Sequence, residues 1–332
     1  MANGAILVTG GAGYIGSHVV RQLGHAGERV VVLDNLTKGF RRAVTAGELI
    51  VGDVGDYSMV SRLLADHQVE TVMHFAAHTV VPESVALPLK YYGNNTCATR
   101  GLLQACIENH VKNFVFSSTA AVYGMPQDGH ASEDSPTIPI NAYGTSKLMS
   151  EWMLRDVAAV NPLRYVALRY FNVGGAHPGG QIGQATPGAT LLTKAACEAM
   201  VGKRPHVSVF GSDYPTPDGT GVRDYLHVED LAAAHLNALS YLRGGGKSTI
   251  LNVGYGHGYS VREVLRMLEK VAGKPLVIRE EDRRAGDPAY LVARADRVRS
   301  ELGWQPRYDD LSAIVSSSLA WERKLLQDPW KN

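Results

Sequence analysis

Short apolar runs alternate with longer amphipathic stretches along the first half of the chain. Each run ends in glycine, serine, aspartate or another small or polar residue, a pattern that predicts buried strands of a parallel sheet. The predicted strands are Ala5–Thr9, Arg29–Leu33, Glu48–Val54, Thr71–Phe75, Phe114–Phe116 and Tyr165–Tyr170. Because strand patterns alternate with helical ones, the sequence predicts an α/β fold with a doubly wound parallel sheet.

The second half of the chain is less regular. Gly175–Gly188 is rich in Gly, Pro and Gln and predicts a loop over a site rather than a linker between domains. In the first half of the chain, a helix is also predicted over about Leu89–Asn109. The later predicted elements are helix Ala189–Val201, strand Val207–Phe210, a helix beginning at Asp230, helix Ser260–Ala272, strand Leu276–Arg279, loop Arg283–Tyr290 and a helix from Leu311.

A glycine-rich turn follows the first predicted strand at once. It reads Gly10-Gly-Ala-Gly13-Tyr-Ile-Gly16, and a helix is expected from Tyr14 to about Leu23. Strand, glycine turn and helix N-terminus are the context of a dinucleotide-binding fingerprint. The glycines allow the turn, the approach of a pyrophosphate and close packing of helix on strand, while the N–H groups of the helix hold the phosphates.

Three further strand ends reach the same edge of the predicted sheet. Asp34 ends the second strand, where a carboxylate accepts hydrogen bonds from the adenosine ribose and repels a 2′-phosphate, so the pattern favours NAD over NADP. Asp53 ends the third strand, where it either accepts a hydrogen bond from the adenine amino group or serves only the turn. Phe75-Ala76-Ala77 ends the fourth, and its small residues leave room for a cofactor ribose.

The strand at Phe114–Phe116 leads into the hydroxyl groups of Ser117-Ser118-Thr119, at the edge where ligands bind in open α/β sheets. Tyr143 and Lys147 follow, four residues apart on one face of a predicted helix. A phenol has a pKa of about 10 and is a poor base at neutral pH. A nearby ammonium and the positive ring of oxidised nicotinamide would both favour the phenolate.

Other polar residues carry weaker indications. Asn94 and Asn95 lie inside a predicted helix, where a buried asparagine either fixes a neighbouring loop or is an ordinary surface amide. Arg223 and Arg284 lie in loops, where a guanidinium fork either binds a phosphate or is a solvated charge. The pair His74 and His78 spans a strand and a loop, so no metal site is predicted.

Composition narrows the classes of protein. The 332 residues suffice for one large α/β unit or two domains that share a core, with 45% hydrophobic and 20% charged residues. The net charge of +1 gives no electrostatic reason to expect nucleic acid or a membrane as partner. No apolar run could span a bilayer, and a strand at Ala5–Thr9 argues against a signal peptide. Cys97, Cys106 and Cys197 share no metal or redox spacing, which is typical of reduced thiols in the cytoplasm.

Several motifs together resemble those of the extended short-chain dehydrogenase/reductase family: the glycines with Asp34, Ser117-Ser118-Thr119, Tyr143-x-x-x-Lys147 and Tyr170-Phe171-Asn172. Within that family the chain is similar to the 4-epimerases of UDP-galactose and UDP-glucose. The segments that carry this likeness are Tyr91-Tyr92-x-Asn94-Asn95, Arg169–Pro178, Asp213–Val228 and Arg284-x-Gly-Asp287-Pro-Ala289. The likeness covers nearly the whole chain, and Asp213–Val228 is its most specific part.

The resemblance implies a Rossmann-type sheet with a smaller α/β C-terminal substrate domain. Residues 1–172 plus about 222–258 would bind NAD, and about 173–221 plus 259–332 would bind the UDP-sugar. The implied activity is reversible epimerisation at C4 through a transient 4-keto sugar, in a homodimer built on two helices per subunit. Tyr143 is the implied base, Lys147 its support on the nicotinamide ribose, and Thr119 a hydrogen-bond partner of the sugar.

The resemblance also implies two sets of binding residues. The NAD set is Gly10, Gly13, Tyr14, Ile15, Gly16, Asp34, Asn35, Asp53, Val54, Phe75, Ala76, Ala77, Asn94, Ser117, Tyr143, Lys147 and Tyr170. The UDP-sugar set is Thr119, Tyr143, Asn172, Thr190, Leu191, Arg223, Tyr225, Arg284, Asp287 and Leu291.

Some positions depart from the pattern of many relatives. Thr79 stands in place of a lysine, Thr190 in place of asparagine or histidine, and Arg294 in place of an aspartate. Leu291 occupies the position that gates N-acetylated sugars in relatives. Because a branched side chain narrows the pocket, we predict weak use of UDP-N-acetylglucosamine.

Rival functions are disfavoured by particular residues. A 4,6-dehydratase or decarboxylase needs acids just after Thr119, whereas Ala120 and Ala121 cannot move a proton. A 4-epimerase of a UDP-pentose stays open. A nucleotide-sensing protein could keep the fold without activity, but it would not need Tyr143 and Lys147.

Overall fold

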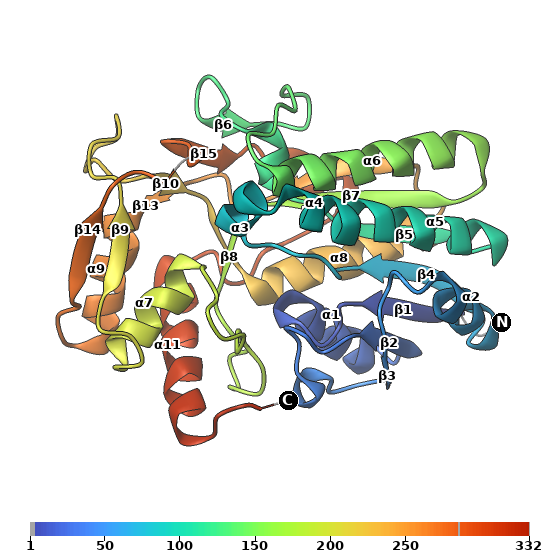
Figure 1. The fold of residues 1–332 in the computed structure, drawn as a ribbon, viewed down its shortest axis with the longest axis horizontal. Coiled ribbons are helices and arrows are strands. Elements are labelled where there is room, and N and C mark those ends of the chain that lie inside the picture. Colours follow the sequence, from blue (N-terminus) through green and yellow to red (C-terminus); the bar gives the residue numbers. More distant parts are fainter. Residues whose placement is uncertain (1–3, 285, 332) are drawn as a thin grey trace.

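The computed structural model describes residues 4–284 and 286–331. At its centre is a seven-stranded sheet in which all strand pairs are parallel. The strands run in the order β12-β7-β5-β4-β1-β2-β3 (Figure 1). They are β1 (Ala5–Thr9), β2 (Val30–Asp34), β3 (Glu48–Val51), β4 (Val69–His74), β5 (Asn113–Ser117), β7 (Arg164–Tyr170) and β12 (Thr249–Val253). The predicted α/β fold with a doubly wound parallel sheet is confirmed, and β12 is a strand that the sequence pattern did not indicate.

Helices cover both faces of this sheet, which is why its strands are apolar on both sides. Ile6 and Val8 of β1 belong to the core shared with α1 (Tyr14–His25) and α8 (Val228–Arg243), whereas Ala5 and Leu7 belong to the core on the other face. That second face is covered by α2 (Tyr57–Asp66), α5 (Ala98–Glu108) and α6 (Ala142–Val160).

The order of the strands places a ligand site. The strand β1 lies between β2 and β4, so the chain winds away from β1 in both directions. The carboxyl ends of β1 and β4, next to each other at this reversal, form the crevice in which open α/β sheets bind ligands. The glycine-rich turn after Thr9 therefore lies opposite the segment that follows His74.

A smaller part of the molecule is built from short strands and helices (left in Figure 1). It contains a four-stranded sheet in the order β13-β10-β15-β6 and the parallel pairs β8–β11 and β9–β14. The strands are β6 (His130–Ala131), β8 (Asn172–Gly174), β9 (Val207–Phe210), β10 (Val222–Arg223), β11 (Tyr225–His227), β13 (Tyr259–Ser260), β14 (Ile278–Glu281) and β15 (Tyr290–Ala293). Its helices are α7 (Leu192–Met200), α9 (Val261–Ala272) and α11 (Leu311–Gln327), whereas α10 (Asp296–Leu302) packs against α8 and β12 of the larger part.

Three predicted helices begin or run differently in the structure. The helix expected at Ala189 begins at Leu192, because Leu191 is still in an extended conformation. The helix expected at Asp230 begins at Val228, where the His227 ring accepts a hydrogen bond from the Glu229 N–H and caps it. The helix expected over 89–109 has three pieces, α4 (Pro88–Tyr91), a π-helical segment (Tyr92–Cys97) and α5.

Several elements were not predicted at all. Among them are α2, α3 (Val81–Ala86), η1 (Arg41–Ala43), η3 (Ala120–Tyr123), α10 and the short strands β6, β10, β11, β13 and β15. The capping box of α9 explains why its start was predictable: Ser260 accepts from the Glu263 N–H at 3.0 Å, and the Glu263 carboxylate accepts from the Ser260 N–H at 2.7 Å. None of the helices in the described part of the chain is long and apolar enough to cross a membrane.

Candidate active site

The glycine-rich turn has no room for side chains. Gly10 has φ +71°, and a Cβ atom there would lie 2.6 Å from the Ala76 nitrogen. A Cβ atom on Gly16 would lie 2.3 Å from the Gly10 carbonyl oxygen. The N-cap of α1, Gly13, offers no side chain to the first N–H groups, and the first turn carries no acid. The turn therefore leaves those N–H groups free for an anion, which fits the pyrophosphate of a dinucleotide.

Asp34 stands beside this turn at the end of β2. Its carboxylate accepts hydrogen bonds from the Ala12 N–H at 3.0 Å and the Leu36 N–H at 2.8 Å. Burial raises the pKa of Asp34, and the two hydrogen bonds oppose that shift. Each carboxylate oxygen has a second lone pair that can accept from a ribose hydroxyl group.

Two of the expected cofactor residues are bound to each other. Asn35 donates from Nδ2 to Asp53 Oδ2 at 2.8 Å, and Asp53 Oδ1 accepts from the Gly55 N–H at 2.8 Å. Asp53 thus serves the turn, and its hydrogen bond to the adenine amino group stays a prediction. Val54 follows as a buried residue.

The segment after β4 is held by an asparagine of the π-helical turn. Asn95 accepts from the His78 N–H at 2.8 Å and donates to the His78 carbonyl at 3.0 Å and to Ser146 Oγ of α6 at 3.0 Å. Asn94 donates to Asn95 Oδ1 at 3.0 Å. Asn95 is therefore the asparagine that fixes a loop, and the loop begins with Phe75-Ala76-Ala77.

The expected catalytic residues meet where β5 ends and α6 begins. Asn141 caps α6 by accepting from the Gly144 N–H at 2.9 Å, which fixes the first turn that carries Tyr143. The Tyr143 side chain is hydrogen-bonded to Thr119. Lys147 donates from Nζ to the Ser117 carbonyl oxygen at 2.8 Å. The structure thus brings the hydroxyl groups of the β5 end, the phenol and the ammonium together, as the sequence predicted.

The neighbours of this group are aromatic. The Tyr170 hydroxyl shares a hydrogen bond of 2.5 Å with Ser117 Oγ, and the Tyr91 ring meets the Tyr143 ring edge-on with centroids 6.5 Å apart. The Lys147 ammonium lies 4.8 Å from the centre of the Phe116 ring. Tyr143 and Lys147 are 8% and 3% exposed, so water has little access to either.

Burial changes both pKa values. It raises the pKa of the Tyr143 phenol, and the hydrogen bond with Thr119 opposes this. Burial lowers the pKa of Lys147 to about 7, against the opposite pull of the Glu151 carboxylate. Desolvation is the larger cause for the phenol, and the Lys147 ammonium is directed at the Ser117 carbonyl. That the ammonium and an oxidised nicotinamide together favour the phenolate stays a prediction.

A buried ion pair, which the sequence analysis missed, holds the helix that carries Tyr143 and Lys147 against the sheet. Arg169 of β7 donates from Nε to Glu151 Oε1 at 3.0 Å and from Nη2 to Oε2 at 2.6 Å. Ser118 donates to Glu151 Oε1 at 2.5 Å. An arginine in the middle of an apolar strand was the available signal. The pair ties α6 to β5 and β7 and so fixes the spacing of Tyr143 from the strand ends.

The residues expected to bind UDP-sugar come from paired short strands. Asn172 of β8 is the register partner of Tyr225 of β11, and Arg223 of β10 is that of Leu291 of β15. Because Leu291 is only 8% exposed, its side chain packs beside Arg223 rather than projecting into solvent.

Two guanidinium groups and a carboxylate gather next to these strands. Arg223 Nη2 lies 3.8 Å from Asp287 Oδ1, and the Arg284 guanidinium carbon lies 3.5 Å from the centre of the Phe210 ring. Burial lowers the pKa of Arg284, and Asp287 opposes the shift. The second position of the motif Arg284-x-Gly-Asp287 lies outside the described residues. The pattern of two arginines suits a doubly charged phosphate ligand.

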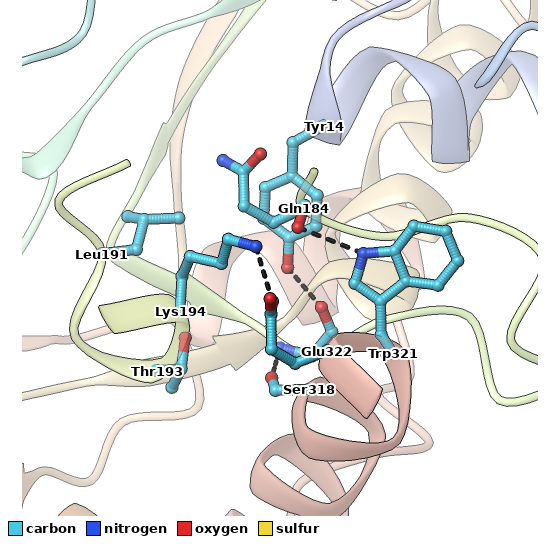
Figure 2. Close-up of a pocket in the computed structure, with 9 residues that line it drawn as sticks. Tyr14, Gln184, Leu191, Thr193, Lys194, Ser318, Trp321 and Glu322 are labelled. Carbon is cyan, nitrogen blue, oxygen red and sulfur yellow. Dashed lines mark hydrogen bonds and ion pairs between the residues drawn. The ribbon is translucent and has the colours of Figure 1, made fainter. Parts of the chain in front are cut away.

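Thr190 and Leu191 precede α7, away from the Tyr143 group in sequence but next to a small cavity. Leu191 lines this cavity with Tyr14, Gln184, Lys194 and Glu322 (Figure 2). Its volume of about 10 Å³ is room for roughly one water molecule, so it is not a sugar-nucleotide site. Lys194 donates to Glu322 across one side of it at 2.5 Å.

Comparison with known proteins agrees with this geometry. A model of the NAD dependent epimerase/dehydratase family matches residues 6–254. A UDP-glucose 4-epimerase of Azospirillum brasilense is 55% identical over 98% of this chain and 94% of its own length.

Solved structures give the same result. A UDP-glucose 4-epimerase from Brucella ovis in complex with NAD is 40% identical, with a TM-score of 0.93 over 96% of this chain and 98% of its own. One from Bifidobacterium longum in complex with NAD+ and UDP is 40% identical, with a TM-score of 0.92 over 96% of this chain and 98% of its own. The chain belongs to the NAD dependent epimerase/dehydratase family, and within it to the UDP-glucose 4-epimerases of the extended short-chain dehydrogenase/reductase type.

Proposed function

We propose that this protein interconverts UDP-galactose and UDP-glucose by reversible, NAD-dependent epimerisation at C4 of the hexose. The observation that carries the proposal is the meeting of Thr119, Tyr143 and Lys147 at the end of β5, beside a glycine-rich turn that fits a dinucleotide. The curated relatives bear the name of this activity.

In the proposed reaction Tyr143 takes the proton of the C4 hydroxyl group while Thr119 hydrogen-bonds to the same end of the sugar. The glycine-rich turn and Asp34 would hold NAD, which would supply reversible hydride transfer at C4 of the sugar. Because burial raises the pKa of the Tyr143 phenol, this base needs nearby positive charge. Lys147 supplies it when its ammonium turns from the Ser117 carbonyl toward the nicotinamide ribose.

The sugar has to turn over between the two half-reactions, so binding energy must come from the nucleotide. We assign this anchoring to Asn172, Arg223, Tyr225, Arg284 and Asp287. Arg223 and Arg284 carry two positive charges, and the nearby Asp287 carboxylate carries one negative charge.

The remaining proposed residues line the two ends of the substrate. Thr190 and Leu191 would meet the nucleotide, and Leu291 would limit the space at C2 of the sugar.

The same proposal divides the chain into an NAD-binding part, 1–172 plus about 222–258, and a UDP-sugar-binding part, about 173–221 plus 259–332. Several short strands pair across that division: β6 and β10 of the first part pair with β15 of the second, and β11 pairs with β8.

A dehydratase is the second candidate function, and the structure gives no support for it. Ala120 and Ala121 open the short helix η3 directly after Thr119, where dehydratases need proton-transferring acids. A UDP-pentose as the natural substrate fits the same residues, because the C4 hydroxyl group is present in both sugars.

The test is incubation of the purified protein with UDP-galactose without added NAD, followed by proton NMR of the sugar. We expect a stable mixture of UDP-galactose and UDP-glucose, which requires both the 4-epimerase and a resident cofactor. If the spectrum does not change, NAD is added. Continued absence of UDP-glucose would then contradict the proposal for hexoses, and UDP-xylose would be tried next.

Two properties of the whole protein belong to the same proposal. We propose a homodimer, in keeping with the exposed apolar residues on α3, α4 and α6. We also propose a cytoplasmic location, since Cys97, Cys106 and Cys197 are free thiols.

A further inference from the structure

The chain after α11 folds back onto the loop that follows β2. We name residues 328–330 the C-terminal strap and residues 36–43 the adenosine loop, because the loop begins next to Asp34. The Trp330 ring meets the Phe40 ring at a centroid distance of 5.7 Å, and the Arg42 guanidinium lies 5.5 Å from the centre of the Trp330 ring. Arg42 also forms a two-pronged ion pair with Asp328. Figure 1 shows the red tail returning to the blue part of the fold.

The other side of the adenosine loop lies against the glycine-rich turn. The Phe40 N–H donates to the Ala12 carbonyl at 2.9 Å, and a Cβ atom on Gly39 would lie 2.7 Å from the Ala12 carbonyl carbon. Ala12 in turn donates its N–H to Asp34. The loop is thus the outer wall of the crevice in which the dinucleotide pyrophosphate and adenosine ribose bind.

The strap is itself held by the smaller part of the molecule. The Trp330 ring packs edge-on against the Trp321 ring of α11, with centroids 5.0 Å apart. Trp321 donates from Nε1 to the Gln184 carbonyl at 3.1 Å, a contact visible in Figure 2. Thr186, two residues further on, donates to the Lys38 carbonyl of the adenosine loop at 2.9 Å. The segment at 184–186 and the strap therefore hold one loop from two sides.

The contacts of the strap differ in strength. The Arg42 and Asp328 side chains are 56% and 47% exposed, so their ion pair adds little in water. Phe40 is 7% exposed, and its contact with Trp330 removes apolar surface from water as well as pairing two rings. The contact between the Phe40 and Trp330 rings therefore stabilises the strap more than the ion pair does, and it is the contact that a substitution should remove.

We propose that Trp330 is a positioning residue that holds the adenosine loop closed over bound NAD and so slows release of the cofactor. NAD can leave only when the outer wall moves away from the glycine-rich turn, and that motion separates the Trp330 and Phe40 rings. An enzyme that regenerates its cofactor in every cycle needs no exchange, so a slow opening does not limit turnover.

The test is exchange of bound NAD in the full-length holoprotein against isotope-labelled NAD, with the bound nucleotide quantified by mass spectrometry. Trp330→Ala should accelerate exchange by about 3- to 10-fold, the range that follows from loss of one aromatic pair. Trp330→Phe should restore most of the wild-type rate. With saturating NAD, kcat should stay within about twofold of wild type, since Trp330 lies outside the Tyr143 group.

A matched control is Leu326→Ala, because Leu326 is a 47% exposed residue of the same helix end that does not belong to the Trp321 cluster. It should leave exchange unchanged. Equal exchange rates for Trp330→Ala and wild type would overturn the proposal, as would equal acceleration by Leu326→Ala. The readout is bound NAD rather than turnover, so it stays informative if the epimerase proposal fails.

Discussion

The phenol of Tyr143 illustrates how one residue depends on groups outside its own helix. Its side chain is 8% exposed and its pKa is raised by burial, so at neutral pH the phenol gives up its proton less readily than that of a free tyrosine and forms less phenolate. The hydrogen bond with Thr119 works in the opposite direction. Positive charge in the site, such as that of an oxidised nicotinamide ring, would favour the phenolate, which links proton transfer to the presence of the cofactor.

Replacing Tyr143 by phenylalanine tests this role. Tyr143→Phe should lower kcat by about 10²- to 10⁴-fold, the usual contribution of a positioned base, because the ring remains and only the hydroxyl group is lost. NAD content after purification should equal that of wild type. Turnover is measured by NMR of the sugar and NAD by absorbance after denaturation. Wild-type turnover in this variant would remove Tyr143 from the mechanism.

Leu291 bears on the choice of sugar. Its side chain is 8% exposed and lies beside Arg223 through the pairing of β15 with β10. Leu291→Ser removes a branched side chain, so kcat/KM for UDP-N-acetylglucosamine should rise about tenfold or more relative to UDP-galactose. Both substrates are assayed with the same preparation. Val292→Ala is the neighbouring control, because Val292 is fully buried in the same strand; an equal change in that variant would assign the effect to general loosening of β15.

At the scale of elements, α6 is positioned by a buried charge pair rather than by packing alone. Arg169 and Glu151 are 4% and 1% exposed and share three hydrogen bonds. Arg169→Met leaves the Glu151 carboxylate buried without its partner and should lower the free energy of unfolding by about 3–5 kcal/mol. The control is Arg155→Met on α6, the helix that carries Glu151, because the Arg155 ion pair is solvent-exposed and its loss should cost at most about 0.5 kcal/mol. Urea unfolding measures both, and similar values would show that the buried pair does not fix α6.

The elements that could be predicted from the sequence are those with strong local signals. The glycine turn and the capping box of Ser260 with Glu263 determine their own conformations, so β1, α1 and α9 were placed within one or two residues. Starts that depend on distant partners were not placed as well. A helix was predicted from Asp230, but it begins at Val228, and the Asp230 carboxylate accepts from the N–H groups of Arg307 and Tyr308.

At the scale of the whole molecule, the candidate site joins segments that are far apart in the sequence. The phenol and ammonium were predictable as a pair because they share one helix. The pairings of β6 with β15 and of β10 with β13 join segments with no local signal for each other, so the smaller sheet could not be derived from the pattern. The roles of Asp53 and Ser118 likewise became clear only from their partners, Asn35 and Glu151.

One face of the molecule predicts how two copies associate. Large apolar side chains are exposed on the helices that flank the sheet on its α6 side: Val85 54%, Leu87 51%, Leu89 81%, Trp152 47% and Val160 81%. The helices α3 and α4 both pack against α6, so these residues lie on neighbouring helices of one side of the fold. Exposed apolar side chains that gather in this way mark an interaction surface. A twofold contact of this surface with itself would bury them in a helix-to-helix interface.

Charge placed on this surface should separate the subunits. Leu89→Glu and Trp152→Glu together bring two like charges into each half of a self-complementary contact, so the protein should elute as a monomer of about half the wild-type mass in light scattering. Val277→Glu is the control, because Val277 is 66% exposed on the far, smaller part of the molecule and should leave the mass unchanged. A wild-type protein that is already monomeric at micromolar concentration, or a double variant that stays dimeric, would rule out this interface. If the monomer keeps NAD and converts UDP-galactose, the site is complete within one chain, as the placement of Tyr143, Lys147 and Arg223 in a single subunit leads us to expect.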